Sequence, residues 1–197
     1  MMKNIINSIL SKNLTAKDLK YIELIIKADI LNTINKKHKK NDIRIITHLN
    51  TSGNFGCAIM DFNGEKQLFI AHSKVQKEKD WELVNAMFSE PYLKGAIRCY
   101  RAEELNQRYT TEWLDDNLDK DTLTAYDRNR DTESKILEEV ASYLDNQGYN
   151  ESKDEISLYL YTVKEPCPSC SKVINTFKSD FREINLEVYY QNNLIKK

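Results

Sequence analysis

The chain has 197 residues, of which 41% are hydrophobic, and this is enough for one folded domain with a buried core. Charged residues make up 30%, but the two signs nearly cancel and the formal net charge is −1. This balance argues against a globally basic nucleic-acid binder, while a local basic groove is still compatible with it. No run of eighteen apolar residues occurs, so we expect no membrane-spanning segment.

The four cysteines are Cys57, Cys99, Cys167 and Cys170, which is too few for a disulfide scaffold in a chain of this length. We interpret Cys57 and Cys99 as small buried hydrophobic residues. Only Cys167 and Cys170 have the spacing of metal ligands or of a redox pair. This cysteine usage suits a reducing compartment, so we expect a cytoplasmic protein.

We expect two parts of the chain: an N-terminal helical leader over residues 1–40 and a main, catalytic domain over residues 41–197. Within the leader we expect a helix over 15–37, which Thr15 can cap and which carries apolar residues at helical spacing. The basic run 36–40 follows. We interpret this run as the solvated end of the helix, with contact to nucleic-acid phosphates as the alternative.

The main domain begins with signals for an antiparallel hairpin. Residues 43–48 alternate well enough for a strand, and 55–62 form a second apolar run. The dipeptide Asn63-Gly64 is a strong hairpin turn signal. Residues 67–72 are then the partner strand.

We interpret residues 80–120 as an insertion or a lid region that is added to the main domain. Its apolar pattern indicates a helix at 81–87 that ends before Pro91, and a short strand at 97–100. Residues 102–118 carry a mixed helical pattern with many charges.

The second half alternates between helix and strand signals. We expect a helix over 131–144, a strand over 156–163, a helix over 167–177 and a last strand over 184–190. This order, following a hairpin, favours an α/β sheet between layers of helices. In such sheets, sites form at strand ends and at helix N-termini, where both chemical motifs of this chain fall.

The first motif is the run from Glu165 to Cys170, which contains Pro166 and two thiols three positions apart. Catalytic zinc usually has three protein ligands and one open position. Cys167 and Cys170 can supply two of these ligands, and Asp131 is our choice for the third. An aspartate with two thiolates leaves a charge of −1 on the centre, as three cysteines do, and the three-cysteine set is accepted in zinc deaminases.

The second motif is Asp131-Thr132-Glu133 at the start of the predicted helix. Glu133 lies two positions after the proposed ligand, so its carboxylate can lie beside the metal without binding it. We predict that Glu133 moves protons from the attacking water to a ring nitrogen and to the departing amine.

Simpler interpretations exist for both motifs. Asp131 can be an ordinary helix N-cap, and Glu133 an acidic residue stabilised by the helix dipole. The cysteine pair can be half of a structural zinc site or a thiol redox pair. A structural site needs a second pair, which Cys57 and Cys99 do not form by their spacing.

These motifs resemble the cytidine-deaminase-like superfamily. The resemblance rests on the segment RDTESKIL (130–137), on YTVKEPCPSC (161–170), and on Val173, Ile174 and Phe177. The Asp-Thr-Glu-x-Lys segment and the hairpin end at 70–73 point to the branch of bacterial polymorphic-toxin deaminases, in which an aspartate at the first metal position is a known variant. The resemblance covers about residues 43–190.

The resemblance implies a three-layer α/β/α fold with a mixed sheet of about five strands that opens with the hairpin. It also implies a Zn²⁺ cofactor and hydrolytic deamination of cytosine in single-stranded DNA or RNA, with DNA favoured. For a toxin it further implies a cognate immunity protein and delivery into a target cell. Such domains usually follow a long delivery region, whereas this chain starts with its own Met and a short helical leader. A standalone intracellular deaminase and a protein delivered by another route are therefore both open.

Three residues are candidates for substrate contact: Asn54, His72 and Pro166. Asn54 can hydrogen-bond a sugar or a base edge, or else be a turn residue after Gly53. His72 can equally be a satisfied histidine at a strand end. Aromatic residues on which a base could stack, with core packing as the default, are Tyr126, Phe181, Tyr189 and Tyr190.

Other functions stay open at this point. The protein can be a deaminase of free nucleosides or bases, and the target base can be cytosine or adenine. From a different class, it can be a zinc-stabilised binding module that has lost catalysis, or a thiol redox protein built on Cys167 and Cys170.

Overall fold

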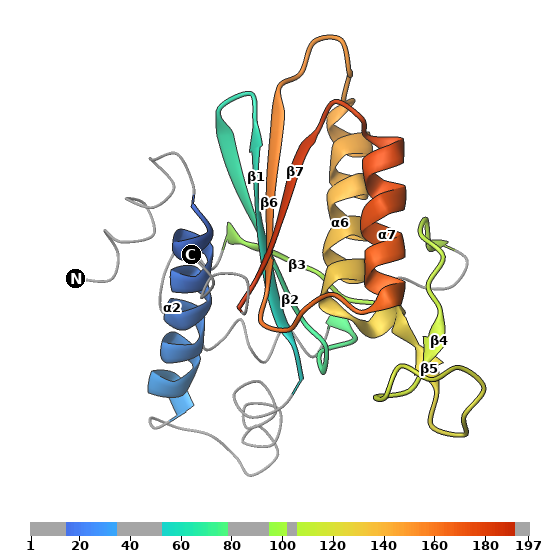
Figure 1. Cartoon of the computed structure of the whole chain (residues 1–197). Helices are drawn as coiled ribbons and strands as arrows, with labels where there is room; N and C mark the ends of the chain where they lie inside the picture. Colours follow the sequence, from blue (N-terminus) through green and yellow to red (C-terminus); the bar gives the residue numbers. More distant parts are fainter. Residues whose placement is uncertain (1–14, 35–52, 79–94, 102–105, 192–197) are drawn as a thin grey trace.

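The computed structural model describes residues 15–34, 53–78, 95–101 and 106–191 (Figure 1). Its centre is a five-stranded mixed sheet with the strand order β3-β2-β1-β6-β7. The strands of this sheet are β1 (Phe55–Phe62), β2 (Glu65–His72), β3 (Ile97–Arg98), β6 (Ile156–Thr162) and β7 (Asn185–Tyr190). The fold class predicted from the sequence is confirmed.

The sheet opens with the predicted hairpin. β1 and β2 pair antiparallel along their whole length, from Phe55 opposite His72 to Phe62 opposite Glu65. Asn63 and Gly64 both have positive φ, at 53° and 88°, which is the conformation that a two-residue hairpin turn of type I′ requires.

The helices that carry the two motifs also form where the sequence predicts them. Helix α6 (Thr132–Gln147) ends at Gly148, which caps it in the left-handed conformation with a φ of 69°. Helix α7 (Pro168–Asp180) follows β6, and the chain then returns as β7. β1 pairs antiparallel with β6, whereas β6 and β7 pair parallel across the α7 connection.

Helices cover both faces of the sheet (Figure 1). Helix α2 (Ala16–Ile34) packs on β1 and β6 from one side, and α6 and α7 lie together on the other. Six of the eight residues of β1 are therefore buried, which explains why its sequence is a nearly continuous apolar run. Alternate residues serve the two faces: Ala58 and Met60 join the core under α6 and α7, while the Cys57 sulfur lies 3.8 Å from the Leu19 carbonyl oxygen of α2.

Helix α2 also makes a polar contact with the sheet. Glu23 is buried, and the hydroxyl of Tyr161 on β6 donates a hydrogen bond of 2.8 Å to its carboxylate. At the start of the helix, the backbone N–H and the hydroxyl of Thr15 donate to the Asp18 carboxylate at 2.9 and 2.6 Å.

The prediction of a mixed helical segment at 102–118 is wrong for the described residues 106–118. There the chain runs mostly without regular structure and forms β4 (Trp113–Leu114), which pairs antiparallel with β5 (Tyr126–Asp127) as a separate two-stranded sheet. Non-local pairing decides this conformation, and a helical charge pattern does not reveal it. The predicted strand at 97–100 exists as the two residues of β3, parallel to β2.

Some predictions lie outside the described residues: the strand at 43–48, the helix at 81–87, the basic run at 36–40 and the domain boundary at 40. Among the helices that are described, none combines the length and the apolar character needed to cross a membrane.

Candidate active site

The N-terminus of α7 presents both thiols of the Cys-x-x-Cys motif. Cys167 is the N-cap residue, and its sulfur accepts the backbone N–H of Cys170 at 3.4 Å. Pro168 occupies the first position of the helix, where its fixed φ is favourable and its missing N–H costs nothing. One turn of helix thus places the two sulfur atoms 3.3 Å apart.

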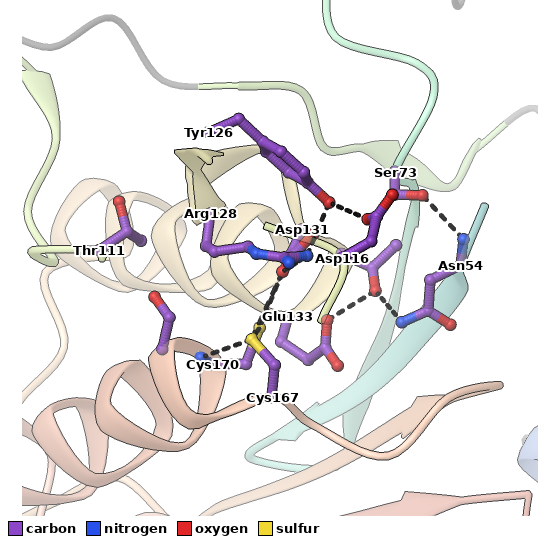
Figure 2. A network of polar contacts seen from close by, with 12 residues as sticks. Asn54, Ser73, Thr111, Asp116, Tyr126, Arg128, Asp131, Glu133, Cys167 and Cys170 are labelled. Carbon is purple, nitrogen blue, oxygen red and sulfur yellow. Dashed lines mark hydrogen bonds and ion pairs between the residues drawn. The ribbon is translucent and has the colours of Figure 1, made fainter. Parts of the chain in front are cut away.

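The N-terminus of α6 presents the acidic motif. A single 3₁₀ turn, η2 (Arg128–Arg130), leads from β5 into α6, and Asp131 ends η2 and caps α6. Although Asp131 occupies the N-cap position, its side chain makes no capping hydrogen bond. The simpler interpretation of Asp131 as a helix cap therefore does not account for its carboxylate, which points toward the thiols (Figure 2).

The three predicted ligands come together. Asp131 Oδ2 lies 3.6 Å from the Cys167 sulfur and 3.4 Å from the Cys170 sulfur, and the group has a geometry that could hold a metal ion. Around a tetrahedral zinc, such sulfur and oxygen ligands lie about 3.5–3.8 Å apart, as follows from metal–ligand distances of about 2.0–2.3 Å. The observed separations fit this donor set with adjustments of under about 0.5 Å.

The protein environment makes Cys167 the more acidic of the two thiols. Hydrogen bonds from the Cys170 side chain and from the Cys170 backbone N–H lower the pKa of Cys167. The same sulfur–sulfur contact, together with burial, raises the pKa of Cys170. The pair therefore holds its first negative charge on the N-cap sulfur, where the helix N-terminus also favours an anion.

Glu133 lies beside this cluster and is almost completely buried, with 2% of its surface exposed. Burial raises the pKa of Glu133 to about 7, and the negative charge of Asp131 adds to the shift. Hydrogen bonds from the Glu133 backbone N–H, from Thr132 and from Cys170 lower the pKa and offset part of this shift. A carboxyl group with a pKa near neutrality can both take and give a proton at neutral pH.

A chain of hydrogen bonds across three elements fixes the Glu133 carboxylate (Figure 2). The Lys164 backbone N–H donates to Asn54 Oδ1 at 3.0 Å, and Asn54 Nδ2 donates to Thr132 Oγ1 at 3.0 Å. The Thr132 hydroxyl then donates to Glu133 Oε2 at 2.8 Å. Thr132 is completely buried, so water does not compete for its hydroxyl, and the carboxylate is oriented before a substrate arrives.

This cluster forms the floor of a pocket with a volume of about 670 Å³. Asp131, Glu133, Cys167 and Cys170 line it, and Pro166 is part of its wall. The remaining walls come from the start of β1, the end of β2, the β4–β5 connection and the end of β6, with the residues Gly53, Asn54, Ser73, Lys74, Asp116, Leu118, Tyr126, Arg128, Lys164, Glu165 and Pro168.

The three predicted substrate contacts have different positions. Pro166 and Asn54 line the pocket, but the Asn54 amide already uses its oxygen and its nitrogen on Lys164 and Thr132. His72 is not among the lining residues; it is buried, and its Nδ1 accepts the Lys74 backbone N–H at 3.1 Å. The structure therefore favours a positioning role for Asn54 and an interior role for His72.

Sequence reasoning missed several residues of the pocket. Arg128 and Asp116 belong to no recognisable sequence motif. Tyr126 was one of four aromatic residues considered for base stacking, and nothing in the sequence separates it from the other three. Arg128 stands three positions before the acidic motif in a charged stretch. Only the 3₁₀ turn between β5 and α6, which sequence patterns do not reveal, turns it toward Asp131.

A sheet between helical layers, with a carboxylate and two cysteines at adjoining helix N-termini and a buried glutamate beside them, defines the cytidine-deaminase-like class. A model of the Toxin-deaminase family, described as the BURPS668_1122 family of deaminases, matches residues 31–192. The chain belongs to this family, which makes it a hydrolytic deaminase of the toxin type. Searches of curated proteins and of solved structures gave no significant match.

Proposed function

We propose that the protein is a zinc-dependent deaminase of cytosine in single-stranded nucleic acid, with DNA favoured over RNA. The observation that carries the proposal is the meeting of Asp131, Cys167 and Cys170 at the floor of one pocket with the buried carboxyl group of Glu133. Family membership supports the reaction type.

Asp131, Cys167 and Cys170 would hold the zinc ion, because their three donor atoms lie within 4.8 Å of one another and are of the types that zinc prefers. A zinc ion with an open position makes a water molecule nucleophilic near neutral pH.

Glu133 performs the proton transfers. Its carboxylate takes a proton from the attacking water and delivers protons to the ring nitrogen and then to the amino group. A C–O bond forms at the ring carbon, the C–N bond breaks, and uracil and ammonia are the products. The hydrogen bond from Thr132 to Oε2 holds the carboxylate in one orientation during these transfers.

The rim of the pocket supports a nucleotide substrate. Lys74 and Lys164 stand on the rim, where they offer positive charge to a phosphate group. Tyr126 contributes an aromatic wall on which a base can stack. A base must leave any duplex to enter such a pocket, and this favours a single-stranded substrate.

The decisive experiment compares wild-type protein with Glu133→Gln on single-stranded DNA and RNA, followed by sequencing for C-to-U changes. Glutamine retains the shape and an acceptor for Thr132 but cannot transfer protons. We expect the variant to lose roughly 10²- to 10⁴-fold in rate while binding as much zinc as wild type. Equal conversion by the two proteins would refute the proposal.

The same samples separate the alternative functions. Ammonia release from cytidine without conversion of the polymers would identify a free-nucleoside deaminase, and conversion of adenine would appear as A-to-G changes in the same reads. A protein with one zinc per chain but no conversion of any substrate would be a binding module. Metal-free protein with a reversible Cys167–Cys170 disulfide would be a redox protein.

A further inference from the structure

Arg128 lies against the proposed metal ligand Asp131. Its Nη1 is 3.6 Å from Asp131 Oδ2, and only 8% and 14% of the two side chains are exposed. A charge pair this deeply buried is weakly screened by solvent, so Arg128 acts directly on the charge of the cluster (Figure 2).

The local structure explains why these two residues meet. A 3₁₀ helix has three residues per turn, so side chains three positions apart lie one above the other. The Asp131 backbone N–H donates to the Arg128 carbonyl oxygen at 2.9 Å and closes the turn η2. The Asp127 side chain caps the same turn by accepting the Asn129 backbone N–H at 3.0 Å.

Other contacts hold the guanidinium group in place. Nη1 donates to the Tyr126 hydroxyl at 2.6 Å, and Nη2 donates to the Asp115 carbonyl oxygen. The guanidinium carbon also lies 4.3 Å from the centre of the Tyr126 ring. The charge is therefore fixed beside Asp131 and is not free to follow a mobile substrate group.

We propose that Arg128 supplies the positive charge that lets an aspartate serve as the first metal ligand; this rests on the proposed zinc-dependent function. Zn²⁺ with a histidine and two thiolates is neutral, whereas with an aspartate and two thiolates it carries a charge of −1. Arg128 restores neutrality, so Arg128 and Asp131 together replace a neutral imidazole. Arg128 is a positioning and charge-balancing residue that does not itself bind the metal.

The test is a double-mutant cycle on zinc affinity, measured by competition with a chromophoric chelator. The four proteins are wild type, Arg128→Gln, Asp131→His and the double variant. In the wild-type background we expect Arg128→Gln to weaken zinc binding about 10- to 100-fold, as removal of a residue behind a ligand typically does. In the Asp131→His background the same change is expected to alter affinity by less than about threefold.

Damage to the fold is separated from the charge effect in two ways. Any disturbance of the Tyr126 and Asp115 contacts enters both backgrounds equally and cancels in the cycle. Arg128→Lys provides the matched control, because it loses the same planar contacts as Arg128→Gln but retains the charge. We expect Arg128→Lys to retain clearly more zinc affinity than Arg128→Gln.

The outcomes distinguish this inference from the proposed function. Stoichiometric zinc binding with equal losses in both backgrounds, or equal losses for Arg128→Lys and Arg128→Gln, would overturn the role of Arg128 and make it a structural brace of the β4–β5 connection. Wild-type protein that binds no zinc would overturn the metal site and this inference together.

Discussion

The N-termini of α6 and α7 meet in one pocket, yet they are built differently. In α7 the N-cap side chain satisfies its own helix, because the Cys167 sulfur accepts the Cys170 N–H. In α6 the N-cap side chain of Asp131 makes no hydrogen bond to the backbone of its own helix. Its carboxylate lies instead against the thiols and Arg128.

The difference shows two ways to place a ligand. The α7 motif is self-contained: its ligands, its cap and its proline lie within four consecutive residues. The α6 motif depends on distant parts of the chain, since Asn54 and Lys164 act through Thr132 to orient Glu133. We therefore expect changes at the α7 thiols to affect metal binding, and changes to the hydrogen bonds around Glu133 in α6 to affect proton transfer.

The largest effect within this comparison is expected for Cys170→Ser. Loss of a thiolate ligand should weaken zinc binding by more than about 100-fold, beyond the range for residues that merely support a ligand. Metal analysis of the purified protein measures this loss. Cys57→Ser, on the opposite face of the sheet near α2, is the matched control and should retain zinc; equal zinc contents in the two variants would contradict the assignment.

A smaller effect is expected for Thr132→Val, which removes the hydroxyl between Asn54 and Glu133 and preserves the shape. The carboxylate loses one orienting donor, so we expect the rate of deamination to fall about tenfold, a part of the roughly 10²- to 10⁴-fold that a whole acid–base group contributes. Zinc content should not change. Thr132→Ser retains the hydroxyl and should restore most of the rate, and a Thr132→Ser variant as slow as Thr132→Val would exclude the hydrogen-bond explanation.

The smallest effect is expected for Gly56→Ala on β1. A Cβ at this position would lie 3.0 Å from the Thr132 Cβ and 3.2 Å from Ile136 Cδ1, so the first turn of α6 must move away from the sheet. We expect the free energy of unfolding to fall by about 1 kcal/mol, at the low end for overpacking, with a modest loss of rate.

Chemical denaturation measures the change in stability for Gly56→Ala. Gly95→Ala serves as its control, because nothing lies within 4 Å of a Cβ there. A Gly56→Ala protein with unchanged stability and rate would show that α6 can shift without disturbing Glu133.

The sequence predicts those parts of the molecule whose signals are local. The Asn63-Gly64 turn fixes the register of β1 and β2, and the Gly148 cap with the preceding apolar stripe fixes the end of α6. The cluster of Asp131, Cys167 and Cys170 could also be predicted, because each ligand opens a helix and the motifs are short.

The rest depends on non-local geometry. The two-residue strands β4 and β5 are too short for a period to show, and they exist through pairing across eleven intervening residues, from 115 to 125. The role of Arg128 follows from the 3₁₀ turn, and the engagement of Asn54 follows from the approach of β1 to α6. His72 was predicted as a substrate contact because it lies at a strand end. The sequence does not reveal that its ring is buried and accepts the Lys74 backbone N–H.

The Cys-Pro-Ser-Cys run also makes a hydrogen bond to the segment that precedes β4. The Ser169 hydroxyl, which is fully buried, accepts the Glu112 backbone N–H at 2.9 Å immediately before β4. Ser169, one of the two residues between the thiols, thus anchors the start of the segment that carries Asp116 and Leu118 to the pocket. We expect that replacing residues 116–124, while retaining Asp115 and the Ser169 anchor, would change target selectivity and leave the zinc affinity of the cluster unchanged.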